Sequence, residues 1–234
     1  MTGLRGLLAP LARTPLHPQW LLGGRKAPAG LGTVRGRVLD IGAGDRWIQE
    51  HLAEQAHYVA VDHPGTGRSL YGARPDVFAD GARLPFADGS FDAVVCLEVL
   101  EHARDPQGVL AELGRVLRPG GVAWLSMPFL YPIHDAPHDY QRFTEYGLRR
   151  GVEAAGLDLQ SVERAQHALR SVGLLGCLAI SGAAYQAPRW QWPLLLPLTA
   201  IAVLSINLMA WLGSFVWPDW NALSSGYSVK ASKP

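Results

Sequence analysis

Asp40-Ile41-Gly42-Ala43-Gly44 decides the fold of this chain, because it closes the apolar run Val38-Leu39. Asp62 stands at the end of the next apolar run, Tyr58-Val59-Ala60-Val61. An apolar strand, a tight glycine turn, a helix and a second strand ending in a carboxylate are typical of a nucleoside-binding βαβ unit. In such a unit the glycines let the backbone approach the ligand, and the carboxylate accepts hydrogen bonds from two ribose hydroxyls.

Length and composition set the outer limits. The chain has 234 residues, which fits one α/β domain with room for an insertion. Its net charge of +1 and lack of a long Lys/Arg run give no sign of a nucleic-acid surface. Cys96 and Cys177 lie in apolar stretches and are not expected to pair, which favours a reducing cytosolic compartment. Pro10, Pro15 and Pro18 interrupt the first twenty residues, so we expect no signal peptide.

Strand-like and helix-like segments alternate after the glycine turn. We expect strands at 37–40, 57–62, 77–80, 91–97, 122–127 and 156–163, and helices at 45–55, 109–117 and 145–155. Residues 63–76 are rich in glycine and proline, which predicts a loop with at most a short helix. Such alternation predicts a mostly parallel sheet with helices on both faces.

Five segments in sequence order make residues 38–159 resemble the class I S-adenosylmethionine-dependent methyltransferases, in particular the type 11 subgroup. The segments are Leu39–Gly44, Asp80–Phe86, Ser90–Val94, Glu98–His102 and Glu112–Gly121. The resemblance implies a Rossmann-like, seven-stranded, mostly parallel sheet whose last two strands form a reversed hairpin. It also implies that ligands bind at the carboxyl ends of strands 1 to 4.

The same resemblance implies a set of cofactor-binding residues. Asp40 would order the glycine loop from beneath, and Gly42 and Gly44 would contact the methionine part of the cofactor. Asp62 would bind the ribose, and Asp80 with the backbone of Gly81 and Ala82 would read the adenine. Leu97 and Glu98 would flank the donor and face the substrate. The family often has a third glycine at position 46, where this chain has Arg46. We expect that side chain to point to solvent or to pair with the cofactor carboxylate.

A nicotinamide-dependent dehydrogenase is the alternative that shares the glycine turn and the following acid. Its fingerprint needs a third glycine three residues after Gly44, where Trp47 is too large for close helix–strand packing. A purely structural turn at Gly42 and Gly44 would not account for Asp62 and Asp80. We therefore favour S-adenosyl-L-methionine as the cofactor.

The loop after the fifth strand carries candidate catalytic residues. His134 and His138 are candidate general bases for a hydroxyl acceptor, with Asp135 or Asp139 as orienting partners. An equal alternative is that these histidines only hold the loop in place. No metal is expected, because the four-residue spacing suits a single face only in a helix and Pro137 disfavours one.

Glu101-His102 also invites a catalytic interpretation. In the resembled family this pair usually lies at the start of a helix beside the pocket, so a capping or packing role is at least as well supported. Thr144 is expected to cap the helix at 145–155.

The second unusual region is strongly apolar. Between Ser171 and Pro218 Arg189 is the single charged residue, and residues 194–216 carry no charge. At ~1.5 Å per residue these 23 residues span ~35 Å, more than a bilayer core. Tryptophans flank the run like interfacial anchors, at Trp190 and Trp192 and at Trp217 and Trp220. A buried core helix of this length would need more surrounding protein than the chain offers.

Residues 224–233 resemble the family's seventh strand, which pairs beside the sixth. A single membrane crossing would put that strand on the wrong side, so the insertion must return. We expect a helical hairpin with arms at 171–187 and 194–216, bent at Pro188 and Pro193, or an interfacial arrangement. The expected domains are an N-terminal cap segment (1–36), a methyltransferase domain (37–165 and 222–234) and an apolar insertion (166–221).

These features predict a methyltransferase that works by in-line displacement on a small or lipid-linked acceptor, such as an isoprenoid quinone or a polyprenyl-linked saccharide. Membrane contact through residues 171–218 predicts a location at the cytoplasmic face of a membrane, with the cytoplasm as the alternative. A non-catalytic cofactor-binding membrane scaffold is the other alternative, which the intact Asp62 and Asp80 disfavour.

Overall fold

The computed structural model describes residues 11 and 13–234, which form two compact units. The sheet unit comprises residues 26–129, 133–163 and 226–234. The hairpin unit comprises the described residues up to Arg25, then 130–132 and 164–225. Much of the expected N-terminal cap, residues 1–10 and 12, lies outside the described residues, and so does most of the stretch that bears on a signal peptide.

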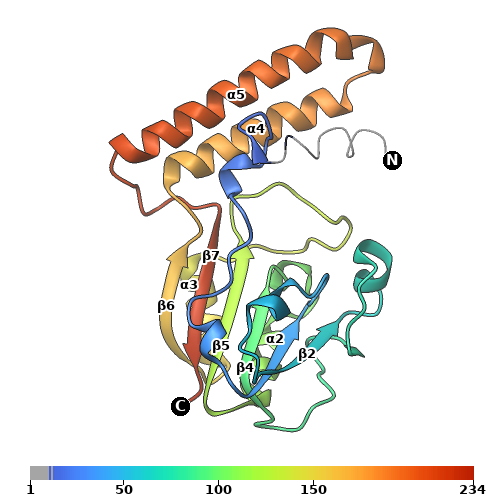
Figure 1. The fold of residues 1–234 in the computed structure, drawn as a ribbon, viewed down its shortest axis with the longest axis vertical. Coiled ribbons are helices and arrows are strands. Elements are labelled where there is room, and N and C mark those ends of the chain that lie inside the picture. Colours follow the sequence, from blue (N-terminus) through green and yellow to red (C-terminus); the bar gives the residue numbers. More distant parts are fainter. Residues whose placement is uncertain (1–10, 12) are drawn as a thin grey trace. The chain divides into compact units, whose positions relative to one another are not determined.

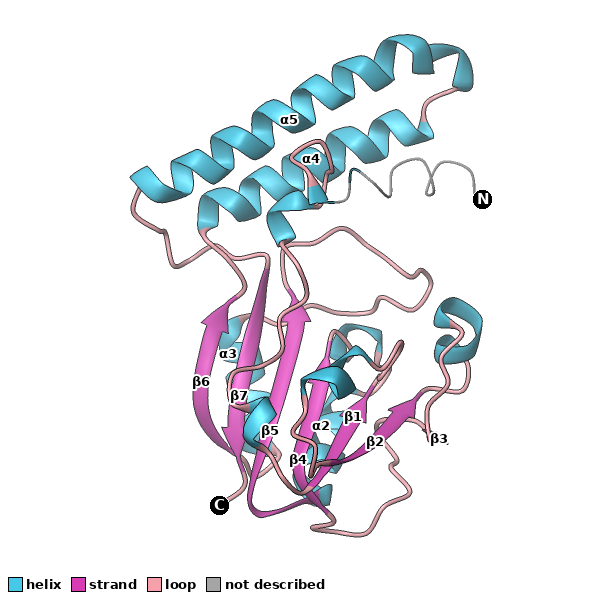
Figure 2. Cartoon of the chain, viewed as in Figure 1, coloured by secondary structure: helices cyan, strands magenta, loops and turns pink. Residues whose placement is uncertain are grey.

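One sheet of seven strands forms the sheet unit, in the order β3-β2-β1-β4-β5-β7-β6 (Figures 1 and 2). The strands are β1 (Arg37–Ile41), β2 (His57–Asp62), β3 (Val77–Phe78), β4 (Phe91–Leu97), β5 (Leu117–Pro128), β6 (Asp158–Arg164) and β7 (Gly226–Ser232). The first five strands pair in parallel, and β7 runs antiparallel to β5. The expected mostly parallel sheet with a reversed last hairpin is confirmed.

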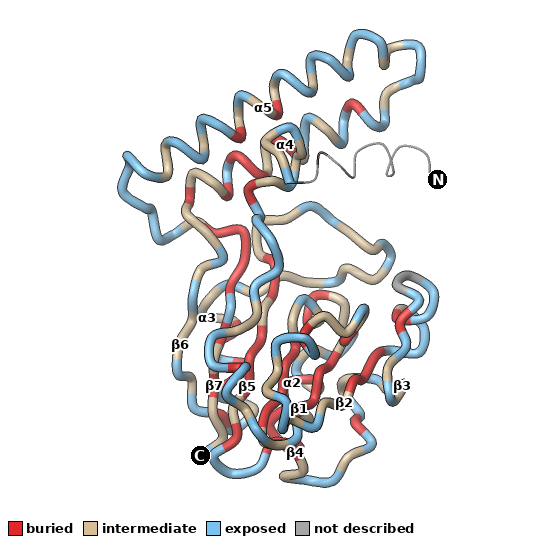
Figure 3. Tube along the Cα trace, in the orientation of Figure 1, coloured by how far each residue is buried: buried red, intermediate tan, exposed pale blue. Residues whose placement is uncertain are grey.

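Alternate residues of the central strands face two separate apolar clusters. Leu39 and Ile41 pack with the helices α2 (Pro106–Val116) and α3 (Glu145–Ala154) on one face. Val38 packs on the other face with Leu31 and Ile48, which come from short 3₁₀ helices. Burial on both faces explains why these strands are continuous apolar runs, and Figure 3 shows them as the buried centre of the unit.

The N-terminal capping residues explain where α2 and α3 begin. Asp105 accepts a hydrogen bond from the Gly108 amide at 2.9 Å, directly before Pro106 in the first turn. Thr144 accepts one from the Gly147 amide at 3.2 Å, as expected from its side chain. Each cap satisfies an amide that has no partner inside its helix.

The prediction of a helix at 45–55 is wrong, because this stretch forms a five-residue 3₁₀ helix, η4 (Trp47–His51). Twelve residues, 45–56, join Gly44 to the start of β2. Since β1 and β2 are parallel, these residues must run back about 16 Å and also turn at both ends. An α-helix over the expected span would use nearly all of them for that rise alone. The more extended 3₁₀ turn and extended flanking residues complete the connection instead.

Two packed helices, α4 (Ala168–Gln186) and α5 (Trp192–Val216), form the hairpin unit, joined by a short turn. The contact between them is close, since a Cβ on Gly173 would lie 2.6 Å from the Cβ of Ala210. The expected hairpin is therefore confirmed. Its bend is shorter than expected: Pro188 precedes the turn, but Pro193 already lies in the first turn of α5, where proline costs no hydrogen bond.

Polar contacts fix the base and the side of the hairpin. Arg164 pairs with Asp219 at 2.5 Å, and Asp219 also accepts a hydrogen bond from the first amide of α4, at Ala168. Buried Asn207 donates to the backbone carbonyls of Pro15 and His17, at 2.7 and 3.0 Å. The described N-terminal residues are thereby held against α5.

By length and composition alone, both hairpin helices could cross a membrane. An 18-residue window within residues 168–186 has a mean hydropathy of 1.4, and one within residues 189–216 has a mean hydropathy of 2.0. Most of this surface is not buried: Ile201 is 63% exposed and Phe215 66%. Figure 3 shows α5 as largely exposed along its length.

Candidate cofactor and acceptor site

The candidate site residues come together because adjacent parallel strands end at the same edge of a sheet. Gly42 follows β1, Asp62 ends β2, Asp80 follows β3 and Leu97 ends β4. The loop that carries His134 and His138 follows β5, which is parallel to β4. Sequence reasoning thus named residues that the sheet does bring to one edge.

Glycine is required at position 42 by both backbone and space. Gly42 has a φ of 73°, and a Cβ there would lie 2.3 Å from Cγ2 of Val99. The amides of Gly42 and Ala43 both donate to the carbonyl of Val61, at 2.9 and 3.1 Å. These bonds tie the glycine turn to the end of β2.

Asp62 organises the same turn through its side chain. One carboxylate oxygen accepts from the Gly44 amide at 2.9 Å and the other from the His63 amide at 2.8 Å. A Cβ on Gly67 would lie 2.5 Å from the second oxygen, so the backbone passes very close to it. Each oxygen keeps a free lone-pair direction, and a buried carboxylate of this kind suits a pair of ribose hydroxyls.

Arg46 takes the left-handed conformation that a glycine would adopt there, with a φ of 61°. Its guanidinium donates to both oxygens of Asp76, at 3.0 and 3.2 Å, and lies over the ring of Tyr58. Asp76 and Tyr58 hold this half-buried side chain beside β2, and its expected pairing with the cofactor carboxylate stays a prediction. No sequence pattern linked these residues.

Asp40 lies beneath the turn and bonds to Tyr58 rather than to the glycines. The Tyr58 hydroxyl donates to its carboxylate at 2.6 Å. Burial raises the pKa of Asp40 to about 7, and the nearby Asp62 charge adds to the rise. Asp40 therefore carries a fractional charge near neutral pH, and the direct side-chain contact with the turn is made by Asp62.

The remaining cofactor residues are more open. Asp80 is exposed and accepts from the Ala82 amide at 3.0 Å, which shapes the turn that contains Gly81. Beyond β4, Glu98 has a φ of 55° and accepts from the Ser126 hydroxyl at 2.6 Å. Leu97 is half-buried at the end of that strand.

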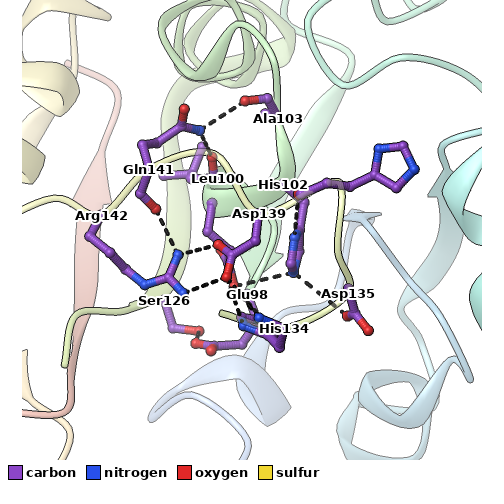
Figure 4. A network of polar contacts seen from close by, with 12 residues as sticks. Glu98, Leu100, His102, Ala103, Ser126, His134, Asp135, Asp139, Gln141 and Arg142 are labelled. Atoms are coloured by element: carbon purple, nitrogen blue, oxygen red, sulfur yellow. Dashed lines mark hydrogen bonds and ion pairs between the residues drawn. The ribbon is translucent and has the colours of Figure 1, made fainter. Parts of the chain in front are cut away.

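A polar network organises the loop after β5 (Figure 4). Arg142 donates two hydrogen bonds to Asp139, which holds the pKa of that carboxyl down at about 2. Asp139 in turn lies 3.2 Å from Nδ1 of His134 and accepts from the His134 amide at 3.0 Å. Of the two expected orienting acids, Asp139 is the one that contacts His134, whereas Asp135 lies 3.9 Å from Nε2 of His102.

Glu101 is the residue whose position sequence reasoning missed. Its side chain is fully buried, and burial raises its pKa to about 8, with the charge of Glu98 adding to the rise. Its Oε1 lies 3.7 Å from Nε2 of His102 and 3.9 Å from Nε2 of His134. Glu101 and His102 form the last two residues of the 3₁₀ helix η6 (Leu100–His102), whereas α2 begins only at Pro106 with Asp105 as its cap, so the expected helix-start position is not the one observed.

Comparison with known proteins is informative at this point. Residues 39–125 match the model of a family described as "Methyltransferase domain". An uncharacterised methyltransferase of Mycolicibacterium gilvum is 33% identical over 187 residues, 72% of each chain. A ubiquinone biosynthesis O-methyltransferase of Hahella chejuensis is 36% identical over 150 residues, covering 53% of this chain and 63% of that protein.

A solved structure shares the fold. Phosphoethanolamine N-methyltransferase 2 of Haemonchus contortus, solved with S-adenosyl-L-methionine, has a TM-score of 0.52 and 16% identity, over 100% of this chain and 60% of that protein. The chain belongs to the methyltransferase-domain family and is a methyltransferase that uses S-adenosyl-L-methionine. The dehydrogenase alternative is thereby excluded.

The residues present fit that cofactor. The Gly42 position leaves no room for a Cβ, Asp62 is a buried carboxylate at the end of β2, and Asp80 is an exposed acid at the next strand end. When bound, the cofactor supplies an activated methyl group on a positively charged sulfur. The chain's part is to bind the donor and to align the acceptor with it.

Proposed function

We propose that this methyltransferase acts on a lipid-like or lipid-linked acceptor at the cytoplasmic face of a membrane. The observation that carries the proposal is the exposed apolar hairpin inserted between β6 and β7. Exposed apolar surface of this extent marks a membrane or partner contact. A relative in Hahella chejuensis is named for ubiquinone biosynthesis, whose acceptors are lipid-like, and this supports the same class of acceptor here.

The hairpin's dimensions support membrane contact. At ~1.5 Å per residue, α4 and α5 are ~28 and ~37 Å long, close to the thickness of a bilayer core. Both ends of the hairpin continue into strands of one sheet, so the chain must return to the side that it left. A hairpin with polar residues at its base, Arg164 and Asp219, meets that requirement. We propose 166–221 as the membrane-associated insertion and 37–165 with 222–234 as the catalytic domain.

Within the catalytic domain we propose the following roles. Gly42 and Gly44 contact the methionine part of the cofactor, and Asp40 lies beneath them. Asp62 binds the ribose, and Asp80 with Gly81 and Ala82 reads the adenine. Leu97 and Glu98 flank the donor. His134 and His138 are candidate bases that take the acceptor proton. The Asp139–Arg142 pair supports this role for His134, because an ionised Asp139 orients the ring through Nδ1.

Cofactor binding is tested by calorimetric titration with S-adenosyl-L-methionine. Asp62→Asn turns an NH₂ group toward the amide of Gly44 or of His63, so we expect at least a tenfold weaker Kd, roughly 1.4 kcal/mol. Asp158→Asn, an exposed change at the start of β6, is the matched control. Equal affinity in the two variants would remove Asp62 from the cofactor site.

Membrane binding is tested by flotation of the full chain with phosphatidylcholine vesicles. Ile201→Lys with Leu212→Lys puts two charges on exposed positions of α5, and we expect this variant to stay out of the vesicle fraction. Leu22→Lys, at an exposed position of the 3₁₀ helix Trp20–Leu22 and outside α4 and α5, is the control and should still float. A wild-type chain that is monomeric and soluble without detergent, and does not float, contradicts the proposal.

The acceptor is identified by incubation with methyl-labelled cofactor and a membrane lipid extract. We expect the label in the organic phase, with loss of turnover in His138→Ala at unchanged cofactor affinity. Label that stays in water-soluble products would point to a small cytoplasmic acceptor instead. Full turnover in His138→Ala and in His134→Ala would remove both histidines as bases.

A further inference from the structure

We propose that Glu101, His102 and His134 bind a divalent transition-metal ion. Their donor atoms all lie within 4.8 Å of one another, although the residues come from η6 and from the loop after β5. Both segments belong to the sheet unit. The sequence argument against a metal considered the loop alone, and it did not pair the loop with Glu101.

The protonation pattern of the two histidines supports the site. Nδ1 of His102 lies 2.8 Å from the backbone carbonyl of His138, which can only accept, so this nitrogen carries the hydrogen. Nδ1 of His134 likewise faces the carboxylate of Asp139. In each neutral ring the lone pair is therefore on Nε2, and the Nε2 atoms are those that approach Glu101. Figure 4 shows both rings with their partners.

Glu101 gives the second, independent observation. Its side chain is fully buried, and within the described part of the chain neither carboxylate oxygen has a hydrogen-bond partner. The two Nε2 atoms, 3.7 and 3.9 Å away, are too distant for a shared proton. A buried carboxylate whose two oxygens lack a hydrogen-bond donor among the described residues calls for a cation, since buried charges are normally paired or bound to metals.

The donor set indicates the kind of ion. Two imidazoles and one carboxylate favour Zn²⁺ or Fe²⁺ over Mg²⁺ or Ca²⁺, which prefer oxygen ligands. A Zn²⁺ ion about 2.1 Å from each donor holds them about 3.0–3.5 Å apart, so His134 must move inward by about an ångström. His134 lies on a loop and is half-buried, which permits this movement. Contacts from Asp139 and the His138 carbonyl are the outer partners that metal-bound histidines normally have.

The bound ion would tie the loop at 133–142 to η6. It would also occupy Nε2 of His134, which leaves His138 as the base among the two candidates. The assignment does not depend on the acceptor or on membrane binding, and its test needs no turnover.

The test is calorimetric titration of the chelator-stripped full chain with ZnCl₂. We expect one Zn²⁺ per chain, and we expect Zn²⁺ to slow amide hydrogen exchange at residues 133–142. Asp139→Asn should weaken binding about 10- to 100-fold, and loss of a ligand in Glu101→Gln or His134→Asn should weaken it further. His57→Ala, at an exposed position, is the control and should bind as the wild type does.

Two outcomes would overturn the site. One is the absence of Zn²⁺ binding by the wild type, and the other is unchanged affinity in the ligand variants. Glu101 is buried, so its variant is first checked for the wild-type unfolding midpoint. If Glu101→Gln is unfolded, His134→Asn, at a half-buried loop position, decides the question alone.

Discussion

Arg46 and Asp76, 30 residues apart in the sequence, form a bidentate ion pair with N–O distances of 3.0 and 3.2 Å. The pair allows an arginine to occupy a left-handed backbone position beside the cofactor loop. The ion pair and the contact with Tyr58 offset the backbone strain.

Replacement of Arg46 separates these two effects. Arg46→Gly removes the ion pair but also the strain of a left-handed residue, which is roughly 1–2 kcal/mol, so we expect a change within about 1 kcal/mol. Arg46→Ala removes the ion pair and keeps the strain, so it should be less stable than Arg46→Gly. Urea unfolding measures both variants. If alanine is as stable as glycine, the left-handed strain has no energetic weight here.

Alanine at Gly42 and at Gly44 should differ in effect. Both glycines have positive φ, at 73° and 51°, so each substitution is strained by roughly 1–2 kcal/mol. Gly42→Ala also meets Val99, whereas a Cβ on Gly44 would lie 4.0 Å from the carbonyl oxygen of Gly42. We expect Gly42→Ala to cost about 1–3 kcal/mol more and to abolish cofactor binding. Urea midpoints and calorimetry check this, and equal losses would show that the Val99 contact is easily relieved.

Asp40 should make stability depend on pH. Its pKa is raised by burial from 3.8 to about 7, so between these values the folded state binds more protons than the unfolded state. The contribution of Asp40 to stability therefore falls as pH rises from about 4 to 7, by up to about 4 kcal/mol, and this contribution is constant above pH 7. Asp40→Asn keeps an acceptor for Tyr58 and lacks the titration. The free energy of unfolding of Asp40→Asn, measured in urea, should rise relative to that of the wild type from pH 4 to pH 8. If the difference between the two proteins stays constant over this range, the raised pKa of Asp40 is contradicted.

Asn207 should hold the N-terminal segment against the hairpin. Its amide donates to the carbonyls of Pro15 and His17, and its oxygen lies 3.4 Å from the Cys177 sulfur. Asn207→Leu leaves both carbonyls without that donor, so we expect faster amide exchange at residues 13–20 and a loss of about 1–3 kcal/mol. Asn221→Ala, at an exposed position, is the control. Unchanged exchange in Asn207→Leu would mean that other contacts hold the segment.

Uninterrupted runs of apolar residues made much of the fold predictable from the sequence. The strand expected at 91–97 forms over those residues, because a run buried on both faces has no other suitable conformation. The hairpin arms were predicted to within a few residues because each is a long apolar run. The helix expected at 45–55 failed because its length depends on where two paired strands begin and end, and the local sequence does not carry that information.

Contacts across the site were less predictable. Gly42 and Asp62 belong to a continuous βαβ pattern, so their meeting follows from the sequence. Glu101 meets His134 because an irregular loop folds back on η6, and Asp139 and Arg142 maintain that loop conformation. Loops of this kind have no periodicity from which the contact could be read.

The position of β7 has a consequence for the order of assembly. Among the seven strands of the sheet β7 is synthesised last, and it is the strand that lies between β5 and β6. Both hairpin helices leave the ribosome before it, so the proposed contact with a bilayer would form while β6 is still without its neighbour. The sheet is then completed by β7, which follows α5 in the chain and pairs between β5 and β6. Biogenesis of the enzyme would thus couple two events, with a correctly returned hairpin as the condition for a complete sheet.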